Sequence, residues 1–331
     1  NLGYAAILKI YHELGLDDFF NNRARNKNFK YNTNSIMILL VVSRLLRPGS
    51  KKKAYEERGR YFERFGFSLA NMYRALSHFA RLTKDFQQYL NTQIREKYGR
   101  NTKTIYYDVT NFYFEIDKAD ELRKYGRSKE KRHNPLVQMG LAMDADGIPI
   151  HYKLFAGNKL DKETFRSVIG EVRTSYDTGR IVVVADMGVI TGDNIYYLTG
   201  GKAENGYVFS FSIKGATDAF KDYVLGSGDY VGADGKPAGP DDTFKIKSRK
   251  IARDINVSIK SGKVAKKVVY EKQVIFWSKK YEDKARAERG EIVKKAMELI
   301  EDPAKYSRAV SYGAAKYVKN MEVDKKTGEI L

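Results

Sequence analysis

The hydrophobic pattern of residues 101–214 constrains the fold of this chain more than any other feature. It predicts three consecutive strands, then a helix, a strand, a second helix and a last strand. These segments are 104–114, 137–143, 148–155, 161–172, 181–185, 191–198 and 207–213. Asp144-Ala145-Asp146-Gly147 joins the second and third strands, and an Asp-Gly step between apolar runs is typical of a hairpin. The first three strands should therefore form an antiparallel meander, and the later strands should arrive through helices.

This order of elements predicts an α/β fold with a ribonuclease H-like mixed sheet at its core. A doubly wound nucleotide-binding fold would instead alternate strand and helix from its first element. The core is expected over residues 101–214. We expect an all-helical domain before it, over residues 1–100, and a β-rich, basic insertion with a charged helix after it, over residues 215–331.

Within residues 1–100 the apolar pattern predicts three main helices. Asn34-Ser35 offers an N-cap for the nearly all-apolar segment 36–46, and Ser68 caps a second helix. A third helix should close at Gly99. Basic residues lie between the first two helices, namely Lys51, Lys52, Lys53, Arg58, Arg60 and Arg64. A surface that grips DNA and a solvated helix face explain these residues about equally well.

The balance of charge points to a polyanionic partner. The 331 residues include 60 Lys and Arg against 41 Asp and Glu, which gives a formal net charge of +19. Nucleic acid is the simplest such partner, because each neutralised phosphate releases counterions. A basic protein that is merely soluble is the alternative. The longest apolar run, residues 36–42, is shorter than the ~20 residues that span a bilayer, and no signal peptide is visible. We therefore expect a cytoplasmic protein with no membrane partner.

Any metal site in this chain must be built from carboxylates. There is no Cys, which excludes disulfides, Cys-based zinc sites and thiol catalysis. The four His residues are scattered, at His12, His78, His133 and His151. Carboxylate oxygens favour Mg²⁺ or Mn²⁺.

Asp108 and Asp186 are the candidate metal ligands. Each lies at or near the end of a hydrophobic strand, where burial would otherwise make a carboxylate costly. Strands one and four of a mixed sheet can lie side by side, so both carboxylates would meet at one spot. Two or three such carboxylates bind a pair of Mg²⁺ ions ~3.5–4 Å apart, which polarise a phosphodiester and activate a water or a 3′-hydroxyl. The alternative is that both residues merely cap strand ends or turns.

Several phrases around these two residues form a series in a fixed order. They are Asp108-Val109-Thr110, the segment 129–144, Gly147-Ile148-Pro149-Ile150, Phe155-Ala156-Gly157-Asn158 and Val184-Ala185-Asp186-Met187-Gly188. The series resembles the DDE-type transposases of bacterial insertion sequences, and more narrowly the branch with a β-rich insertion between the second Asp and the final Glu. The resemblance covers roughly residues 70–331.

The resemblance implies an enzyme that cleaves and transfers DNA strands with two divalent metal ions, Mg²⁺ or Mn²⁺. By this match Asp108 takes the place of the first catalytic Asp and Asp186 that of the second. The implied partners are double-stranded DNA, as transposon ends and target, and a second copy of the chain in a homodimer on DNA.

The third ligand of the family is a Glu on a helix after the insertion, in a Tyr…Arg…Glu…Lys setting. Glu282, Glu288, Glu291 and Glu301 precede the place where it should come and lack that setting. We therefore expect no third catalytic Glu in this chain. The chain begins with Asn1 and ends at Leu331, so we expect both ends to be cuts in a longer reading frame, with the last core helix beyond Leu331.

The segment 118–133 is a basic, Gly-containing loop next to the first Asp. The candidate DNA-binding residues are Arg127, Lys129, Lys131 and Arg132. A basic loop beside a metal site could hold the DNA backbone, and a mobile solvent loop is the alternative. Gly200-Gly201-Lys202 and Gly226-Ser227-Gly228 lack the residues of a phosphate-binding loop and are interpreted as turns.

Three functional hypotheses follow from the sequence. The first is a transposase that cleaves and joins DNA strands. The second is a catalytically inactive DNA-binding transposase remnant, which the missing Glu favours. The third is a structure-selective nuclease on the same fold, which would not need the large insertion and would not transfer strands.

Overall fold

The computed structural model describes residues 2–116, 118–126, 134–176, 178–200, 205–259 and 262–301. The chain divides into two compact units. The first consists of Asn1–Phe211 together with Asn256–Lys267, and the second of Ser212–Ile255 together with Val268–Leu331. The expected division into three domains stays a prediction, but the first unit does contain two separate hydrophobic cores, one helical and one around a sheet.

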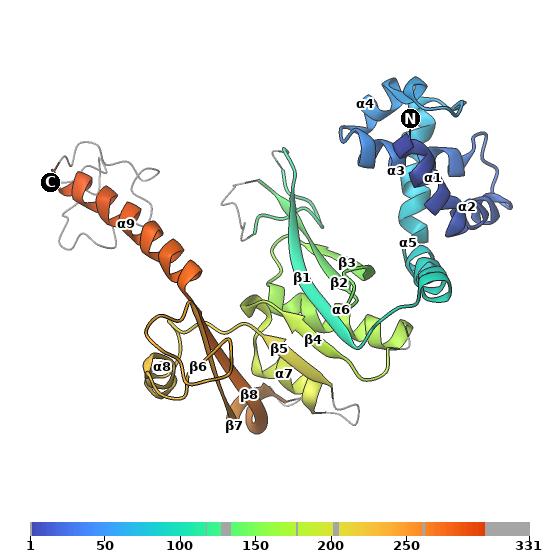
Figure 1. Cartoon of the computed structure of the whole chain (residues 1–331). Helices are drawn as coiled ribbons and strands as arrows, with labels where there is room; N and C mark the ends of the chain where they lie inside the picture. The colour runs from blue at the N-terminus through green and yellow to red at the C-terminus, as the bar shows by residue number, and fades with distance from the viewer. Residues whose placement is uncertain are drawn as a thin grey trace. The chain divides into compact units, whose positions relative to one another are not determined.

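The helical part of the first unit spans five α-helices and one 3₁₀-helix (Figure 1). They are α1 (Leu2–Glu13), α2 (Leu16–Ala24), α3 (Thr33–Leu46), α4 (Lys51–Glu56), η1 (Arg58–Arg60) and α5 (Leu69–Tyr98). Fully buried side chains from α2, α3 and α5 form its core, including Phe20, Leu39 and Met72. Aromatic rings fill much of the rest, for example Phe19 and Phe20 at a centroid distance of 5.2 Å.

Two predictions for these helices were wrong in detail. The side chain of Asn32, not the Asn34-Ser35 pair, caps α3, because Asn32 Oδ1 accepts the backbone N–H of Ser35 at 3.0 Å. The expected second and third helices are one helix, α5, of 30 residues. No Gly or Pro lies between them to break it, and the N-cap Ser68 and the end at Gly99 are as expected.

The second core surrounds a five-stranded mixed sheet (Figure 1). Its strands are β1 (Thr104–Tyr113), β2 (Leu136–Met143), β3 (Pro149–Ala156), β4 (Val182–Ala185) and β5 (Gly206–Phe209), in the order β3-β2-β1-β4-β5. β1–β2 and β2–β3 pair antiparallel, whereas β1–β4 and β4–β5 pair parallel. The predicted meander and the predicted contact of the first and fourth strands are both confirmed. β5 ends at Phe209, shorter than the expected strand 207–213.

One face of this sheet is covered by α6 (Asp161–Ser175), which contacts β2 and β3 and the short helix α7 (Gly192–Thr199). Four apolar residues on one face of α6 are fully buried, namely Phe165, Val168, Ile169 and Val172. They pack on the odd-numbered residues of β1, and the Tyr107 hydroxyl lies 2.6 Å from Thr164 Oγ1.

The opposite face of the sheet is more exposed. Burial along β4 alternates, with Val183 and Ala185 buried and Val182 and Val184 half-buried. Tyr106 on β1 is 40% exposed and Val208 on β5 is 57% exposed. Such alternation is typical of a sheet that packs a covering layer on only one side.

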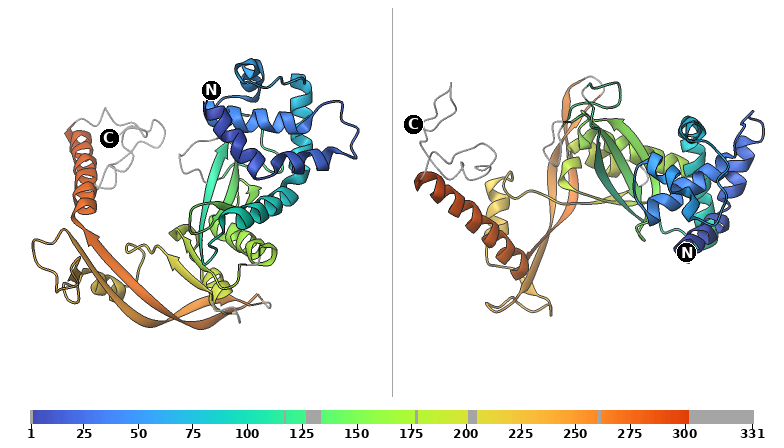
Figure 2. Two further views of the ribbon diagram at one scale, coloured as in Figure 1. Left: turned by 45° about the vertical axis from the view of Figure 1, so that its right-hand side comes forward. Right: turned by 90° about the horizontal axis from the view of Figure 1, so that it is seen from above.

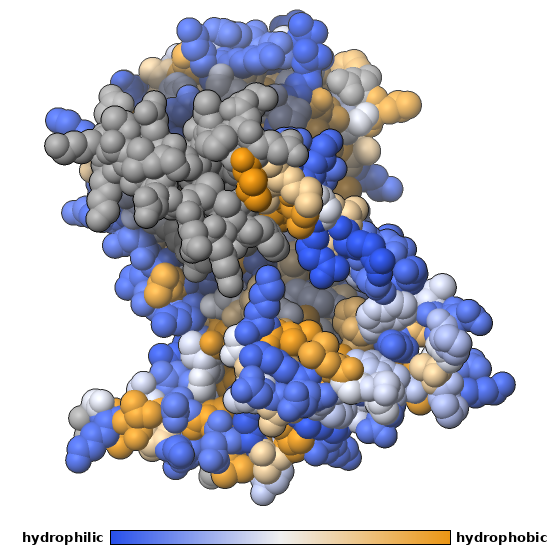
Figure 3. All heavy atoms as spheres, turned by 90° about the vertical axis from the view of Figure 1, so that its left-hand side faces the viewer, coloured by the Kyte–Doolittle hydropathy of each residue, from blue (hydrophilic) through white to orange (hydrophobic). Residues whose placement is uncertain are grey.

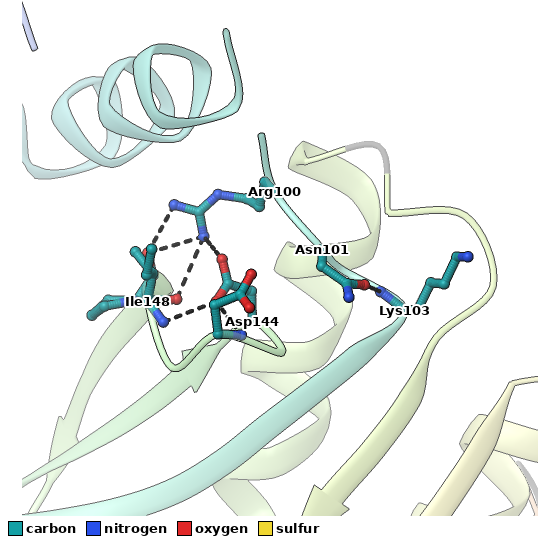
Figure 4. Close-up of polar contacts among 7 residues, drawn as sticks. Arg100, Asn101, Lys103, Asp144 and Ile148 are labelled. Carbon is teal, nitrogen blue, oxygen red and sulfur yellow. Dashed lines mark hydrogen bonds and ion pairs between the residues drawn. The ribbon is translucent and has the colours of Figure 1, made fainter. Parts of the chain in front are cut away.

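The turn between β2 and β3 is fixed by a buried ion pair (Figure 4). Asp144 Oδ1 accepts the backbone N–H groups of Asp146 and Ile148, and Asp144 Oδ2 lies 3.1 Å from Arg100 Nη1. The side chains of Arg100 and Asp144 are only 2% and 1% exposed. Gly147 has a φ of +78°, which favours glycine at this turn. The pair ties the segment before β1 to the predicted hairpin.

The second unit is built around a smaller sheet of order β6-β7-β8. Its elements are α8 (Asp218–Leu225), β6 (Val231–Gly232), β7 (Phe244–Ser258), β8 (Val264–Ser278) and α9 (Lys279–Glu301), and the outer part of the β7–β8 hairpin counts with the first unit. Figure 2 shows β7 and β8 as a long twisted ribbon. The basic strands and the charged helix were expected, but α8 was missed.

Lys247 shows that the basic strands are not uniformly a binding surface. It is 4% exposed, its Nζ donates to the carbonyl of Gly226 at 2.7 Å, and it lies over the rings of Tyr223 and Tyr230. Burial lowers the pKa of this ammonium group. Lys247 therefore ties β7 to the segment after α8.

The described residues include no helix that is both long and apolar enough to cross a bilayer. Hydrophilic residues predominate on the face drawn in Figure 3, and apolar residues form separate patches among them.

Candidate functional site

Asp108 and Asp186 follow directly on a ladder of paired residues. The parallel pairing of β1 with β4 runs from Thr104↔Val182 to Tyr107↔Ala185. The next residues along the chain are Asp108, still within β1, and Asp186, directly after β4. Neighbouring strands lie about 4.8 Å apart, and residues at matching positions point to the same face. The two carboxylates therefore belong to one side of the sheet.

That side is the exposed face, away from α6. Tyr107 and Ala185 are buried in the core, so the side chains that follow them point the other way. Both Asp108 and Asp186 are exposed. The sequence argument that burial would make these carboxylates costly was thus wrong, because both can be hydrated.

β1 and β4 end at different positions relative to their Asp residues. β1 runs on to Tyr113, so Asp108 lies inside a strand and pairs with Leu141 of β2, not at a strand end as expected. Asp186 does follow the last residue of β4 and begins the short 3₁₀-helix η2 (Met187–Val189) with an extended backbone. Asp108 is therefore held by its pairing with β2, one residue beyond the last pair of β1 with β4.

Ser210 positions Asp186 and was not found from the sequence. Asp186 Oδ1 accepts the backbone N–H of Met187 and the hydroxyl of Ser210, each at 2.7 Å. Ser210 directly follows β5, whose last residue Phe209 pairs with Ala185. The signal in the sequence was its place after a strand parallel to β4, but the length of β5 was misjudged.

A further carboxylate, Asp161, lies beside the turn that follows Asp186. It is the first residue of α6, and a Cβ atom added to Gly188 would lie 3.1 Å from its Oδ2. Burial raises the pKa of the Tyr107 hydroxyl above its ordinary range, and the charges of Asp161 and Asp108 add to this effect. Nevertheless, the described residues form no group of three His, Cys, Asp or Glu side chains that could hold a metal ion.

The four Glu residues considered from the sequence lie on α9 of the second unit. Glu282 accepts from Arg286 Nη2 at 2.6 Å, and Glu288 Oε1 lies 4.0 Å from Lys284 Nζ. Both pairs are of the i,i+4 type that stabilises an exposed helix.

The four candidate DNA-binding residues, Arg127, Lys129, Lys131 and Arg132, lie outside the described residues. The described part of their loop, residues 118–126, is paired with the start of β2. Lys124 exchanges two backbone hydrogen bonds with Leu136, and Arg123 Nε donates to Asp120 at 2.6 Å. A Cβ on Gly126 would lie 1.8 Å from the Gly157 carbonyl oxygen, so only glycine fits there. The loop thus begins from a fixed point at the end of β3.

No protein-family model matches the chain, and no curated protein matches its sequence. Solved structures of transposases are similar to it in part. The piggyBac transposase synaptic complex with hairpin DNA aligns over 75% of this chain and 51% of that chain, with 9% identity and a TM-score of 0.38.

Two Mos1 structures align over less of the chain. The Mos1 transposase paired-end complex with left transposon end covers 47% of this chain and 73% of that chain, at 10% identity and a TM-score of 0.19. The Mos1 mariner paired end complex with Mn aligns over 52% of this chain and 57% of that chain, at 11% identity and a TM-score of 0.17. The chain spans about half the length of the piggyBac transposase chain.

Proposed function

We propose that this chain is the DNA-binding and catalytic part of a DNA transposase with a ribonuclease H-like core. The substrate of such a transposase is double-stranded DNA, which is cleaved at transposon ends and joined to a target. One observation carries this proposal: Asp108 and Asp186 are each the first residue beyond the parallel β1–β4 ladder, and both lie on the exposed face of the sheet. A duplex can approach two carboxylates placed in this way.

The donor chemistry at this face fits Mg²⁺ or Mn²⁺. Asp108 and Asp186 would hold the ion through hard carboxylate oxygens, with water as further ligands, since Mg²⁺ usually takes only one or two carboxylates from the protein. When bound, such ions polarise a phosphodiester and activate the attacking water or 3′-hydroxyl. We expect two such ions in an active transposase of this kind. Ser210 and the Met187 backbone N–H hold one oxygen of Asp186 in place.

Basic residues elsewhere in the chain would bind the DNA backbone. The net charge of +19 attracts the phosphate backbone, and we assign the loop residues Arg127, Lys129, Lys131 and Arg132 to contacts with it. Because transposition joins two ends to one target, we expect a homodimer on DNA.

The chain itself should bind DNA and cut it poorly. The described residues offer no group of three possible ligands, and a two-metal site that lacks one ligand should be slower by on the order of a thousandfold or more. The same observation favours the second candidate function, a DNA-binding transposase remnant without catalysis.

The test uses the purified 331-residue chain, Mn²⁺ and DNA that carries the ends of the encoding element, with Asp186→Ala as the control variant. We expect DNA binding by both proteins and weak or undetectable cleavage. Robust cleavage that Asp186→Ala abolishes would show that a carboxylate of this chain completes the site. Cleavage without joining to target DNA would favour the nuclease, and failure to bind DNA would overturn the proposal.

A further inference from the structure

A depression with a volume of about 630 Å³ lies in the helical part of the first unit, between the end of α2 and the middle of α5. Three cationic side chains line it, Arg23, Lys27 and Arg81, and no acidic side chain does. Arg23 lies in the last turn of α2, Lys27 in the segment that follows this helix, and Arg81 on α5. Arg23 also pairs with Asp85 at 3.0 Å, outside the lining. The pocket therefore keeps an excess of positive charge.

Uncharged hydrogen-bond donors stand beside these cations. Asn22, Asn26 and Asn28 also line the depression, and each carries an amide NH₂ group. Asn22 lies in the last turn of α2, and Asn26 and Asn28 lie in the segment that follows it. The backbone that presents them is fixed, since Lys27 N–H donates to the Ala24 carbonyl at 2.9 Å. A pocket with this lining suits a ligand with several acceptor oxygens.

His78 is the residue that most strongly indicates a ligand, because it is buried and lines the same depression. It is 6% exposed, and its ring lies against Phe29 at a centroid distance of 4.8 Å. Its Nε2 has no hydrogen-bond partner among the described residues. Burial lowers the pKa of this imidazole, and the charges of Arg81 and Lys27 lower it further. Buried polar atoms nearly always have partners, and a neutral imidazole with its proton on Nε2 can donate to a ligand oxygen.

We propose that this pocket binds a phosphate group, most simply one of a nucleic-acid backbone. Cations and amide donors around one depression match the charge and the acceptor oxygens of a phosphodiester. The volume exceeds that of one phosphate, which leaves room for the adjoining sugars. The assignment to a backbone phosphate rests on the proposed DNA-binding function, whereas the phosphate chemistry of the pocket does not.

The first experiment measures duplex DNA binding by fluorescence anisotropy over a series of salt concentrations. Each phosphate contact contributes close to one unit to the slope of log K against log salt. We expect Arg81→Ala and Lys27→Ala each to reduce that slope by about one unit. Lys97→Ala, an exposed cation further along α5 and outside the pocket, is the matched control and should leave it unchanged. An unchanged slope in both pocket variants overturns the backbone assignment.

The second experiment follows His78 by NMR in the full chain with ¹⁵N-labelled histidine. The signal is assigned with His78→Gln or, if that variant does not fold, through contacts with the Phe29 ring. The probes are duplex DNA, inorganic phosphate and AMP. A shift with DNA that high salt reverses supports a backbone phosphate. A shift with inorganic phosphate or AMP alone supports a site for a small phosphate compound. No shift with any probe overturns the pocket.

These readouts separate the pocket from the proposed function. If the parent chain binds duplex DNA and Asp186→Asn weakens Mn²⁺ binding, while Arg81→Ala and Lys27→Ala keep the parent's salt slope, the pocket assignment fails and the transposase proposal stands. If the chain does not bind DNA but inorganic phosphate shifts the His78 signal, the transposase proposal fails and the phosphate site stands.

Discussion

Asp108 and Asp186 each come one residue after the Tyr107↔Ala185 pair, the last pair of the parallel strands β1 and β4. Because side chains alternate between the faces of a sheet, a slip of one residue in this register would send one carboxylate into the core. Burial of Tyr107 and Ala185 against α6 prevents that slip. The packing of the core thus decides that both carboxylates share one exposed face.

Metal affinity should depend on both carboxylates and, more weakly, on Ser210. We expect Asp108→Asn and Asp186→Asn each to weaken Mn²⁺ binding by more than tenfold, measured by the EPR signal of free Mn²⁺. Ser210→Ala should weaken Mn²⁺ binding by about tenfold, the lower end of the effect of removing a hydrogen-bond partner of a metal ligand. The reason is that Ser210 holds one oxygen of Asp186 at 2.7 Å.

Ser248→Ala, an exposed serine on β7, is the control for this series and should bind Mn²⁺ normally. The stability of all four variants should stay within about 0.5 kcal/mol of the parent, since the changed residues are exposed. Equal Mn²⁺ binding by the parent and Asp186→Asn would refute the assigned metal ligands.

The salt dependence of DNA binding should report on the basic loop. Replacing Lys129, Lys131 and Arg132 with Ala should flatten the slope of log K against log salt by about one unit per lost phosphate contact. The charge-preserving variant Lys129→Arg, Lys131→Arg, Arg132→Lys should keep the parent's slope. Were the Ala variant to keep it as well, the loop would not touch DNA.

The sequence predicted the sheet well because its signals are local and periodic. The Asp144–Gly147 turn, the apolar face of α6 and the Thr191 cap of α7 each lie within one short segment. The adjacency of the first and fourth strands followed from the order of elements. Asp108 and Asp186 could therefore be singled out before the fold was seen.

The remaining features depend on contacts between distant segments or on the absence of a signal. Ser210 reaches Asp186 over 24 residues and Arg100 reaches Asp144 over 44, and neither spacing has a periodicity. The eight residues of α8 are too few to show a helical period against the Gly-rich stretch around them. The pocket around His78 joins α2 to α5, which no local pattern reveals.

Breaking the Arg100–Asp144 pair should destabilise the first unit strongly. We expect Arg100→Ala to lower the free energy of unfolding by about 3–5 kcal/mol, because it leaves a buried carboxylate without its cation. The measurement is urea unfolding followed by circular dichroism. Arg286→Ala, which removes an exposed i,i+4 pair on α9, is the control and should cost no more than about 0.5 kcal/mol. A similar small loss in Arg100→Ala would mean that the pair contributes little.

Acid should destabilise the chain through its buried histidines, and His151 is the clearest case. Burial lowers the pKa of His151, which lies 3.1 Å from the Tyr176 hydroxyl and from Glu171 Oε2, with Lys153 nearby. A histidine whose pKa is lower in the folded state binds fewer protons there than in the unfolded chain. The stability it contributes is present above the unfolded pKa of about 6.5 and is lost as pH falls towards the folded value.

The test compares urea unfolding at pH 7.5 and 5.5. One histidine contributes at most about 1.4 kcal/mol per pH unit, so His151→Gln should lose measurably less stability over this range than the parent chain. His12→Gln, a change at a histidine whose side chain is about half exposed, is the control and should follow the parent. The same loss in His151→Gln as in the parent would show that His151 does not set the acid sensitivity. His78, whose pKa burial also lowers, would then be the next residue to change.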